Sequence, residues 1–380
     1  MTHKTRVAVL TNIIPEYRKD FYVRLFTNKS VDLTVFCQKD IPGLNIPSVH
    51  RELKGNVVEL RSIGLSSEKL VWQRLPLRKL LTDFDVIFLY GNPRVISGVV
   101  WGGLLRVLGK KVVIWGQLHT AGANPVLERI RLGWWRIFRY AFLYTDAEAR
   151  KLRDMRKGGG CFIGMNNGLN QEAINNVVQQ WDKGKLAAWK HEKDLENRRL
   201  ILSCARLIEK NKFELMLYLL PEIIKEDPEI IWCVVGDGDK KQELMNLASA
   251  LGVEKHVQWK GVIYNEEELA PWFLSAEFLV HPGSIGLSLM HAFGYGLPVI
   301  THNNEADQMP EFAALEDGVN GFLFEQDCPV SLKEKVLAVL GDSGLKKQAS
   351  IEALKTAREG YNTKVMADRF MQMVECVQGK

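Results

Sequence analysis

The residues from 278 to 287 have the composition of an anion-binding loop. An apolar run at 278–280 leads into Gly283 and Gly286, which allow close backbone approach, and a helical pattern begins at Leu287. The first N–H groups of a helix have no intrahelical acceptor, and its positive dipole end attracts negative charge. We therefore expect phosphate oxygens to bind the backbone amides of Ser284, Ile285, Gly286 and Leu287.

Basic side chains after another apolar run would complete such a site. Arg206, Lys210 and Lys212 follow the run at 199–205. A guanidinium binds two phosphate oxygens at once, and lysines at a helix start are poor partners for its dipole unless an anion is present. With the 284–287 amides, Arg206 and one of the two lysines would stabilise a departing nucleoside diphosphate without a metal. The spacing leaves open which lysine serves.

Aspartate pairs that suit a metal occur twice, as Asp83 with Asp85 and as Asp237 with Asp239. Their oxygens are suitable ligands for Mg²⁺ or Mn²⁺ carrying a nucleoside diphosphate. The first pair precedes its strand, which is the wrong edge of a parallel sheet for a ligand, whereas the second follows its strand. We expect structural roles for both pairs, and hence no metal site and no metal requirement.

Gly236 and Gly238 lie where a dinucleotide-binding fingerprint would begin, after the run at 229–236. The third glycine of that fingerprint is missing, and Lys241 stands in its place. A tight strand-to-helix turn accounts for both glycines, and such a turn lets a nucleotide approach the backbone. We expect a nucleotide here but no dinucleotide cofactor.

Short apolar runs alternate with helix-length segments along the chain, as in parallel sheets buried on both faces. The runs lie at 6–11, 32–37, 85–90 and 111–116, and then at 199–205, 229–236, 256–261, 277–281 and 297–301. We predict an α/β protein with two doubly wound Rossmann-like domains facing across a cleft, because such sheets bind ligands at the carboxyl ends of their strands. Domains at 1–175 and 199–360 are predicted, with the polar stretch 176–198 as their linker.

Charge divides the 380-residue chain into two unlike halves. Residues 1–198 carry a net charge of +14 and residues 199–380 a net charge of −9, which together give +5. A basic half suits a phosphorylated partner or an anionic membrane surface, although like charges are equally often a solvated face. No nucleic acid partner is expected.

The six cysteines show neither a C-x-x-C pair nor zinc-site spacing, so we expect them to be reduced, in a reducing compartment. No stretch reaches the roughly 18 apolar residues that span a bilayer, and the N-terminal run is too short for a signal peptide. The expected location is the cytoplasm, with at most peripheral attachment to the inner face of the cytoplasmic membrane.

Four blocks of the C-terminal half resemble, in order and spacing, the GT-B glycosyltransferases of family 4. They are CARLIEKNKFEL, CVVGDGDKKQELMNLASALGVEKHVQWKGVI, GSIGLSLMHAFGYGLPVITHNN and MPEFAALEDGVNGFLF, which cover most of residues 199–325. The N-terminal half is similar more loosely, through VAVLTNIIPEYRKDFYVRL, VVIWGQLH and FIGMNNGLN. Residues 361–380 resemble the terminal helix that family members pack back onto the first domain.

The resemblance implies transfer of a sugar from a nucleotide sugar, a UDP-sugar rather than a GDP-sugar, to a glycan or lipid-linked acceptor with retained anomeric configuration. Arg206 with Lys210 or Lys212 would hold the diphosphate. His119 would contact the donor sugar, with a histidine in an ordinary loop as the equal alternative. The nucleotide would lie against Gly236, Gly238, Val262 and Tyr264.

The acceptor would bind the first domain near Asn12, Pro15, Glu16 and Tyr17. The implied process is synthesis of a bacterial cell-surface polysaccharide such as O-antigen, capsule or exopolysaccharide.

Three positions depart from the family pattern. Gly283 and His291 stand where the family has two glutamates, and Asn211 stands where it has the lysine. A carboxylate contact to the donor sugar is thereby lost, whereas His291 still offers a hydrogen bond to the ribose. Chemistry based on backbone amides and a cationic clamp survives these changes. A protein that binds a sugar or nucleotide without turnover is the alternative.

Residues 128–144 have the pattern of a basic amphipathic helix. Its apolar positions are Ile130, Trp134, Ile137, Phe138 and Ala141, and its arginines are Arg129, Arg131, Arg136 and Arg139. Such a helix could lie on an anionic membrane surface. A helix packed on its sheet, with the arginines at the rim, is the equal alternative.

Overall fold

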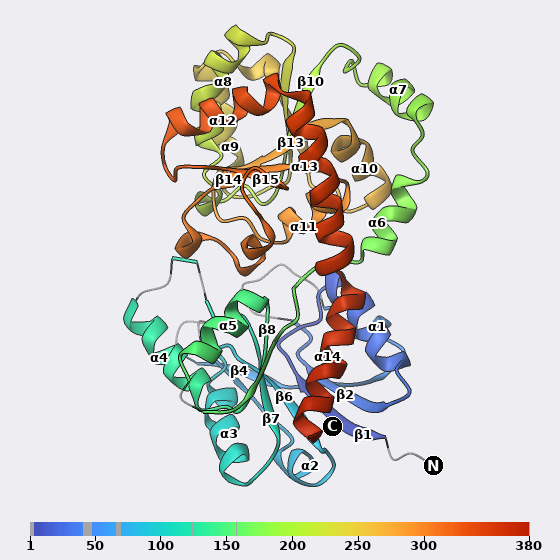
Figure 1. The fold of residues 1–380 in the computed structure, drawn as a ribbon, viewed down its shortest axis with the longest axis vertical. Coiled ribbons are helices and arrows are strands. Elements are labelled where there is room, and N and C mark those ends of the chain that lie inside the picture. The colour runs from blue at the N-terminus through green and yellow to red at the C-terminus, as the bar shows by residue number, and fades with distance from the viewer. Residues whose placement is uncertain are drawn as a thin grey trace. The chain divides into compact units, whose positions relative to one another are not determined.

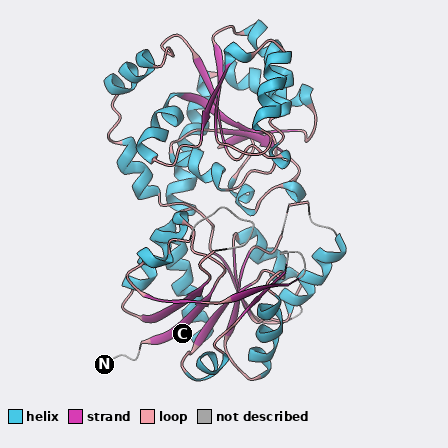
Figure 2. Cartoon of the chain, turned by 180° about the vertical axis from the view of Figure 1, so that it is seen from behind, coloured by secondary structure: helices cyan, strands magenta, loops and turns pink. Residues whose placement is uncertain are grey.

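The structure is a computed structural model and describes residues 4–40, 48–65, 70–119, 121–122, 125–156 and 158–379. The chain forms two compact units: an N-terminal unit of residues 1–170 with 362–380, and a C-terminal unit of residues 171–361. Each unit contains a parallel β-sheet with helices on both of its faces (Figure 1, Figure 2). Each unit is therefore doubly wound.

Seven parallel strands form the sheet of the N-terminal unit, in the order β3-β2-β1-β6-β7-β8-β9. Most of the strands are nearly continuous apolar runs, because helices bury both faces of the sheet. The strands are β1 (Thr5–Leu10), β2 (Val31–Cys37), β3 (Asn56–Glu59), β6 (Val86–Tyr90), β7 (Val112–Gly116), β8 (Tyr140–Leu143) and β9 (Cys161–Gly164). A separate antiparallel pair consists of β4 (Ser62–Leu65) and β5 (Leu70–Gln73).

Two apolar cores flank this sheet. One contains side chains of α1 (Lys19–Thr27) and α14 (Thr363–Gln378), and Phe370 of α14 stacks on Phe88 with ring centroids 4.2 Å apart. The other contains side chains of α2 (Leu77–Thr82), α3 (Ile96–Val107), α4 (Pro125–Arg136) and α5 (Asp146–Asp154). The contacts thus group the terminal helix with the N-terminal unit.

Six parallel strands form the sheet of the C-terminal unit, in the order β12-β11-β10-β13-β14-β15. They are β10 (Arg199–Cys204), β11 (Ile230–Val235), β12 (Val257–Gly261), β13 (Ala276–His281), β14 (Val299–His302) and β15 (Gly321–Phe324). The helices are α6 (Gln171–Val178), α7 (Lys183–Glu192), α8 (Glu214–Glu226), α9 (Lys241–Ala250), α10 (Glu266–Ser275), α11 (Leu287–Gly294), α12 (Pro329–Gly341) and α13 (Ser343–Lys355). No helix in the described part of the chain is long and apolar enough to cross a membrane.

All nine strands expected from the apolar runs are present, and two doubly wound Rossmann-like domains are confirmed. The runs missed β3, β8, β9 and β15, which have four residues each and so show little periodicity. The predicted linker 176–198 is wrong, because α7 lies within it and Trp189 packs on Trp272 with ring centroids 4.6 Å apart. The chain passes between the units at 170–171 and 361–362 instead. That the domains face across a cleft stays a prediction.

A disulfide joins Cys161 of β9 to Cys376 of α14, within the N-terminal unit. The expectation that all six cysteines are reduced is therefore wrong for this pair. Their separation of 215 residues hides the pairing in the sequence, because only the docking of the terminal helix brings them together. Closing so long a loop restricts the unfolded chain and so stabilises the attachment of α14.

Candidate functional site

The predicted cationic segment, residues 205–212, follows β10 at the point where the strand order of the C-terminal sheet reverses. Strand β10 lies between β11 and β13, which continue the chain in opposite directions across the sheet. Doubly wound sheets bind ligands at the carboxyl edge of this switch point. Arg206, which is exposed, and the loop after β13 therefore both lie at the expected edge.

Three glycines let the backbone of this segment pass very close to neighbouring loops. A Cβ at Gly236 would lie 1.9 Å from the carbonyl oxygen of Ala205, and one at Gly238 would lie 2.2 Å from that of Leu207. A Cβ at Gly283 would lie 2.1 Å from the carbonyl oxygen of Lys210. The close approach at Gly236 and Gly238 is thus made by the protein's own backbone, and their contact with a nucleotide stays a prediction.

Backbone and side-chain hydrogen bonds hold the same segment. The Leu207 N–H donates to the Asp237 carbonyl at 2.9 Å, and the Lys240 N–H donates to the Leu207 carbonyl at 3.0 Å. The buried Asn211 amide donates to the carbonyl of Arg206 at 2.7 Å. Asn211 therefore fixes the backbone that carries Arg206.

The two candidate lysines have different surroundings. Removal from water and, to a smaller extent, the charge of Arg206 lower the pKa of Lys210. Lys212 instead forms an ion pair with Asp327 at 2.6 Å. Two neighbouring cations gain free energy from a shared anion. We therefore expect Lys210 rather than Lys212 to act with Arg206, and this choice stays a prediction.

The loop 283–286 offers fewer amides than expected. The Ser284 N–H donates to the Lys210 carbonyl at 3.4 Å, and the Ile285 N–H donates to Oε1 of Gln308 at 2.7 Å. These two amides thus have acceptors within the unit, and their binding of phosphate stays a prediction. Those of Gly286, the N-cap residue, and Leu287, where α11 begins, have no partner in the described ranges and are the ones left for an anion.

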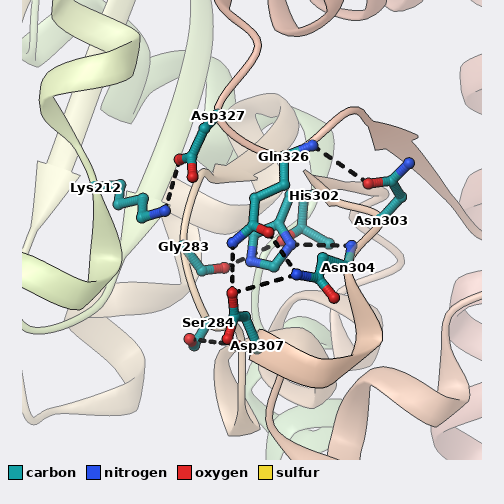
Figure 3. A network of polar contacts seen from close by, with 10 residues as sticks. Lys212, Gly283, Ser284, His302, Asn303, Asn304, Asp307, Gln326 and Asp327 are labelled. Atoms are coloured by element: carbon teal, nitrogen blue, oxygen red, sulfur yellow. Dashed lines mark hydrogen bonds and ion pairs between the residues drawn. The ribbon is translucent and has the colours of Figure 1, made fainter. Parts of the chain in front are cut away.

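A polar network supports this loop from the segments that follow β14 and β15 (Figure 3). The Ser284 hydroxyl donates to the carbonyl of Asp307. The Asp307 carboxylate accepts from Asn304 at 3.3 Å and from Gln326 at 2.8 Å, and Asn304 also donates to Gln326. Since every member has a partner, the network fixes the entry to α11.

His291 pairs with an acidic residue that the sequence did not single out. Its Nε2 lies 2.7 Å from Oε1 of Glu266, at the start of α10, and the Tyr295 hydroxyl donates to the same oxygen. Burial raises the pKa of Glu266, but these hydrogen bonds outweigh burial, and its net pKa is lowered. A carboxylate is thus present beside position 291, supplied from another helix. Only the fold reveals it, because 25 residues separate the two positions.

The remaining predicted nucleotide contacts, Val262 and Tyr264, follow β12. Tyr264 is 93% exposed and Val262 is also exposed, so the structure does not bring either against the segment 205–212. Their role beside the base stays a prediction.

The Asp-x-Asp pairs are engaged in local contacts. Asp85 forms an ion pair with Arg6 at 2.8 Å, and Asp237 forms one with Lys241 at 3.0 Å. Within the described ranges there is no group of three or more His, Cys, Asp or Glu side chains that could hold a metal ion.

A buried histidine beside the loop predicts a pH dependence of stability. Burial lowers the pKa of His281 to about 4, although a hydrogen bond with the Gly283 carbonyl acts in the opposite direction. Below pH 6.5 the unfolded chain takes up a proton at this residue and the folded chain does not, so stability falls with falling pH. The free energy of unfolding should therefore drop by about 1.4 kcal/mol per pH unit between pH 6.5 and 4 because of this residue.

Urea denaturation of the wild type and of His281→Gln across this range measures the effect. The difference in the free energy of unfolding between the two proteins should shrink as the pH falls below 6.5 and stay constant above pH 7.5. A difference that does not change between pH 7.5 and 5 would contradict the prediction.

The predicted acceptor residues lie after β1 in the N-terminal unit, also at a switch point, since β1 lies between β2 and β6. Asn12, Pro15 and Tyr17 line one cavity there. Glu16 does not line it and instead lies 3.6 Å from Lys19. Sequence reasoning missed the other polar side chains of this edge, Arg18, Arg94 and Arg131. Their positions soon after the ends of β1, β6 and β7 were the available signal.

His119, the predicted donor-sugar contact, lies in the loop after β7. Its backbone N–H and that of Leu118 donate to the buried Glu148 carboxylate at 3.1 and 2.7 Å. Its Nδ1 lies 3.1 Å from Oε1 of Glu128. These contacts fix the ring at the carboxyl edge of the sheet, while its contact with a donor sugar stays a prediction.

Comparison with known families agrees with this geometry. Residues 187–356, nearly all of the C-terminal unit, match the family described as Glycosyl transferases group 1. The C-terminal unit is thus similar to the glycosyltransferases of group 1. The group 1 match contains Arg206, Lys210, the 283–287 loop and the pair His291 with Glu266. Membership of family 4 in particular stays a prediction.

Curated glycosyltransferases are distant relatives of the chain. The lipopolysaccharide core biosynthesis glycosyltransferase LpsE of Rhizobium meliloti (strain 1021) is 20% identical over 178 residues, which are 46% of this chain and 49% of LpsE. The poly(ribitol-phosphate) alpha-N-acetylglucosaminyltransferase of Staphylococcus aureus (strain COL) is 19% identical over 206 residues, 54% of this chain and 41% of that enzyme. The chain thus spans about half or less of the length of these relatives.

Solved structures extend the likeness to both units. The structure of Anabaena Alr3699/HepE in complex with UDP has a TM-score of 0.71 at 13% identity and covers 98% of this chain and 100% of its own. The apo form of the lipopolysaccharide outer core galactosyltransferase WaaB has a TM-score of 0.64 at 13% identity, and the match covers 98% of this chain and 99% of WaaB. At this identity the likeness concerns the fold, which is that of GT-B glycosyltransferases.

Proposed function

We propose that the protein is a retaining glycosyltransferase that moves a sugar from a nucleoside-diphosphate sugar, a UDP-sugar in the first instance, to a glycan or lipid-linked acceptor. The observation that carries the proposal is that the segment with Arg206 and Lys210 lies against Gly283, in the loop that leads to the amides of Gly286 and Leu287, within a unit that matches group 1. The UDP bound in HepE supports UDP as the nucleotide of the donor. The relatives named for lipopolysaccharide core and poly(ribitol-phosphate) support a cell-surface polysaccharide as the product.

In the proposed mechanism the protein stabilises the leaving group and supplies no nucleophile. The bond between the anomeric carbon and the diphosphate breaks while Arg206, Lys210 and the helix start take up the developing charge. The acceptor hydroxyl then attacks from the same face, and a diphosphate oxygen takes its proton. The ribose is held by the pair His291 with Glu266, in place of the family glutamate. A metal ion is not required in this mechanism, since Arg206 and Lys210 neutralise the charge of the diphosphate in its place.

A second candidate function, binding of a nucleotide or sugar without turnover, is favoured by one observation. Position 283 carries no carboxylate, and the neighbouring Lys210 carbonyl leaves no room for a side chain there. A contact to the donor sugar that the family makes is therefore missing.

Calorimetric titration of the purified protein with UDP, GDP, ADP, dTDP and NAD, in buffer containing EDTA, tests the donor site. We expect UDP to bind in the micromolar range and NAD not to bind. Binding of UDP that requires added Mg²⁺ would contradict metal independence. If no nucleoside diphosphate binds, the proposed donor site is wrong. Turnover assays with UDP-sugars then separate the enzyme from the non-catalytic alternative.

Peripheral contact with an anionic membrane is the proposed attachment. Val107 of α3 is 76% exposed and Ile130 of α4 is 65% exposed. Burial and the charges of Arg106 and Arg139 lower the pKa of Arg156, so three guanidinium groups lie near one another in this unit. Exposed apolar side chains near a basic cluster suit a surface of anionic lipid.

The helix predicted over 128–144 is corrected in detail. Helix α4 ends at Arg136, Phe138 is buried, and Ala141 lies in β8. Ile130 and Ile137 remain exposed, so the apolar face open to solvent is smaller than the sequence pattern indicates.

Vesicle flotation tests this attachment. The wild type should float with vesicles that contain phosphatidylglycerol and not with phosphatidylcholine alone. The double variant Val107→Glu with Ile130→Glu should lose this retention, whereas Met245→Glu, at an exposed apolar position of the C-terminal unit, should keep it. Wild-type protein that does not float with anionic vesicles would overturn the membrane contact.

A further inference from the structure

Two small cavities adjoin at the carboxyl edge of the N-terminal sheet. One, of about 130 Å³, lies beside the end of β1, and the other, of about 150 Å³, lies beside the end of β6. Tyr90, the last residue of β6, lines both. Strands β1 and β6 are neighbours at the switch point of this sheet, where ligands are expected. Each cavity is smaller than the roughly 300 to 1,000 Å³ of drug-sized sites, so each fits one group of a larger ligand.

The charged side chains that line these cavities are all basic. Arg18 lines the first cavity, and Arg94 and Arg131 line the second, with no aspartate or glutamate among the described lining residues. Arg94 and Arg131 line the same cavity, and burial together with the charge of Arg94 lowers the pKa of Arg131. An anion between them would relieve this repulsion and accept hydrogen bonds from both.

The nearest carboxylates have other contacts. Glu128 and Glu148 both raise the pKa of Arg131, so they lie near it. Glu128 hydrogen-bonds with the ring of His119. Glu148 accepts the backbone N–H groups of Leu118 at 2.7 Å and Tyr144 at 3.0 Å. These carboxylates hold the loops after β7 and β8 and do not line either cavity.

Arg18 brings a permanent charge into a buried place. Its side chain is 4% exposed, and its guanidinium lies 5.7 Å from the ring centroid of Tyr17 and 5.2 Å from that of Tyr144. A guanidinium stays charged even when buried, and its attraction for an anion is stronger there than in bulk water. The flanking rings hold its plane, as cation–π contacts do. Arg18 is therefore preorganised to bind an anionic group.

Aromatic and amide side chains complete the lining. Tyr17, Tyr90, Trp115 and Tyr144 line the first cavity, and Asn92 and Gln117 line the second. Aromatic rings with polar tips suit a ligand that has both apolar and hydroxyl-bearing faces, and amides both donate and accept hydrogen bonds. A simple inorganic anion uses none of these rings, whereas a sugar ring that carries an anionic group uses both kinds of lining.

We propose that the two cavities bind an anionic saccharide, a sugar that carries a phosphate or a carboxylate, and that this saccharide is the acceptor of the sugar transfer. Its role as acceptor rests on the proposed function, whereas its binding does not. Arg18, Arg94 and Arg131 hold the anionic group, and the aromatic rings hold the sugar.

Calorimetry of the full chain with glucose 6-phosphate, glucuronate, glucose and inorganic phosphate tests the proposal. At least one of the two anionic sugars should bind about tenfold or more tightly than glucose. Arg94→Gln, at an exposed position that tolerates substitution, should remove this preference. Arg18→Gln should do the same if it folds. Arg78→Gln, at an exposed arginine of α2, should keep it, and UDP binding should be the same in all of these proteins.

Each outcome of this calorimetry supports or overturns one part of the proposal. Preference for glucose 6-phosphate identifies a phosphate, and preference for glucuronate identifies a carboxylate. Equal binding of glucose, an unchanged preference in Arg94→Gln, or inorganic phosphate binding as tightly as glucose 6-phosphate overturns the anionic saccharide. If none of the sugars binds while UDP does, this inference fails and the proposed function remains. If the anionic sugars bind and UDP does not, the proposed function fails and the site remains.

Discussion

Replacement of Arg206 by alanine should lower the rate of sugar transfer by about 10² to 10⁴-fold, provided that the protein is an enzyme of the proposed kind. Arg206 is exposed at the carboxyl edge of the C-terminal sheet, and Lys210 is the second cation beside it. Since the charge on the leaving diphosphate grows as the glycosidic bond breaks, the guanidinium stabilises the transition state more than the bound donor. The loss should therefore appear mainly in kcat.

Steady-state kinetics with the preferred UDP-sugar measure this loss. Arg198→Ala is the matched control, because Arg198 is in the same unit, before β10, and forms an ion pair with Glu229 at 3.2 Å, away from the carboxyl edge. Its turnover should stay within about twofold of the wild type, as is usual for surface substitutions. Near-normal turnover in Arg206→Ala would remove the cationic clamp from the mechanism.

The sheets could be predicted from the sequence because buried parallel strands are read directly as apolar runs. The runs that became β1, β6, β10 and β13 supplied strands at both switch points, but the strand order that creates the switch points is known only from the fold. The short strands β8 and β9 were missed because four residues show little periodicity. The disulfide between Cys161 and Cys376 could not be predicted, because it depends on the docking of a helix from the far end of the chain.

The candidate site was predictable in its residue types and not in its pairings. The spacing of Arg206, Lys210 and Lys212 indicated a clamp, but only the ion pair of Lys212 with Asp327 distinguishes the lysines. Likewise, a helix start predicts free amides, yet Gln308 occupies that of Ile285 from a loop beyond the next strand. Such tertiary hydrogen bonds leave no local pattern in the sequence.

Gly283 is expected to tolerate no side chain, not even the glutamate that the resemblance to family 4 implies at this position. A Cβ at this position would lie 2.1 Å from the Lys210 carbonyl oxygen and 2.6 Å from Cα of Asn211. Because these are backbone atoms, a rotamer change cannot relieve the overlap, and the segment that carries Arg206 has to move. Gly283→Ala should therefore destabilise the C-terminal unit by about 3 kcal/mol, the upper end of the usual cost of overpacking.

Gly283→Glu should show at least the same loss, with weaker UDP binding and no gain in turnover, since displacing the 205–212 segment also displaces the clamp. Thermal melting and UDP calorimetry measure the two effects. Gly341→Ala, at the end of α12 with no atom within 4 Å of the added Cβ, should melt at or slightly above the wild-type temperature. A Gly283→Glu protein that is as stable as the wild type and more active would show that the segment yields, and that the missing glutamate is a loss of function. If neither Gly283→Ala nor Gly283→Glu folds stably, backbone packing against Gly283 positions Arg206 and Lys210 in this chain, at the position where the resemblance to family 4 implies a carboxylate.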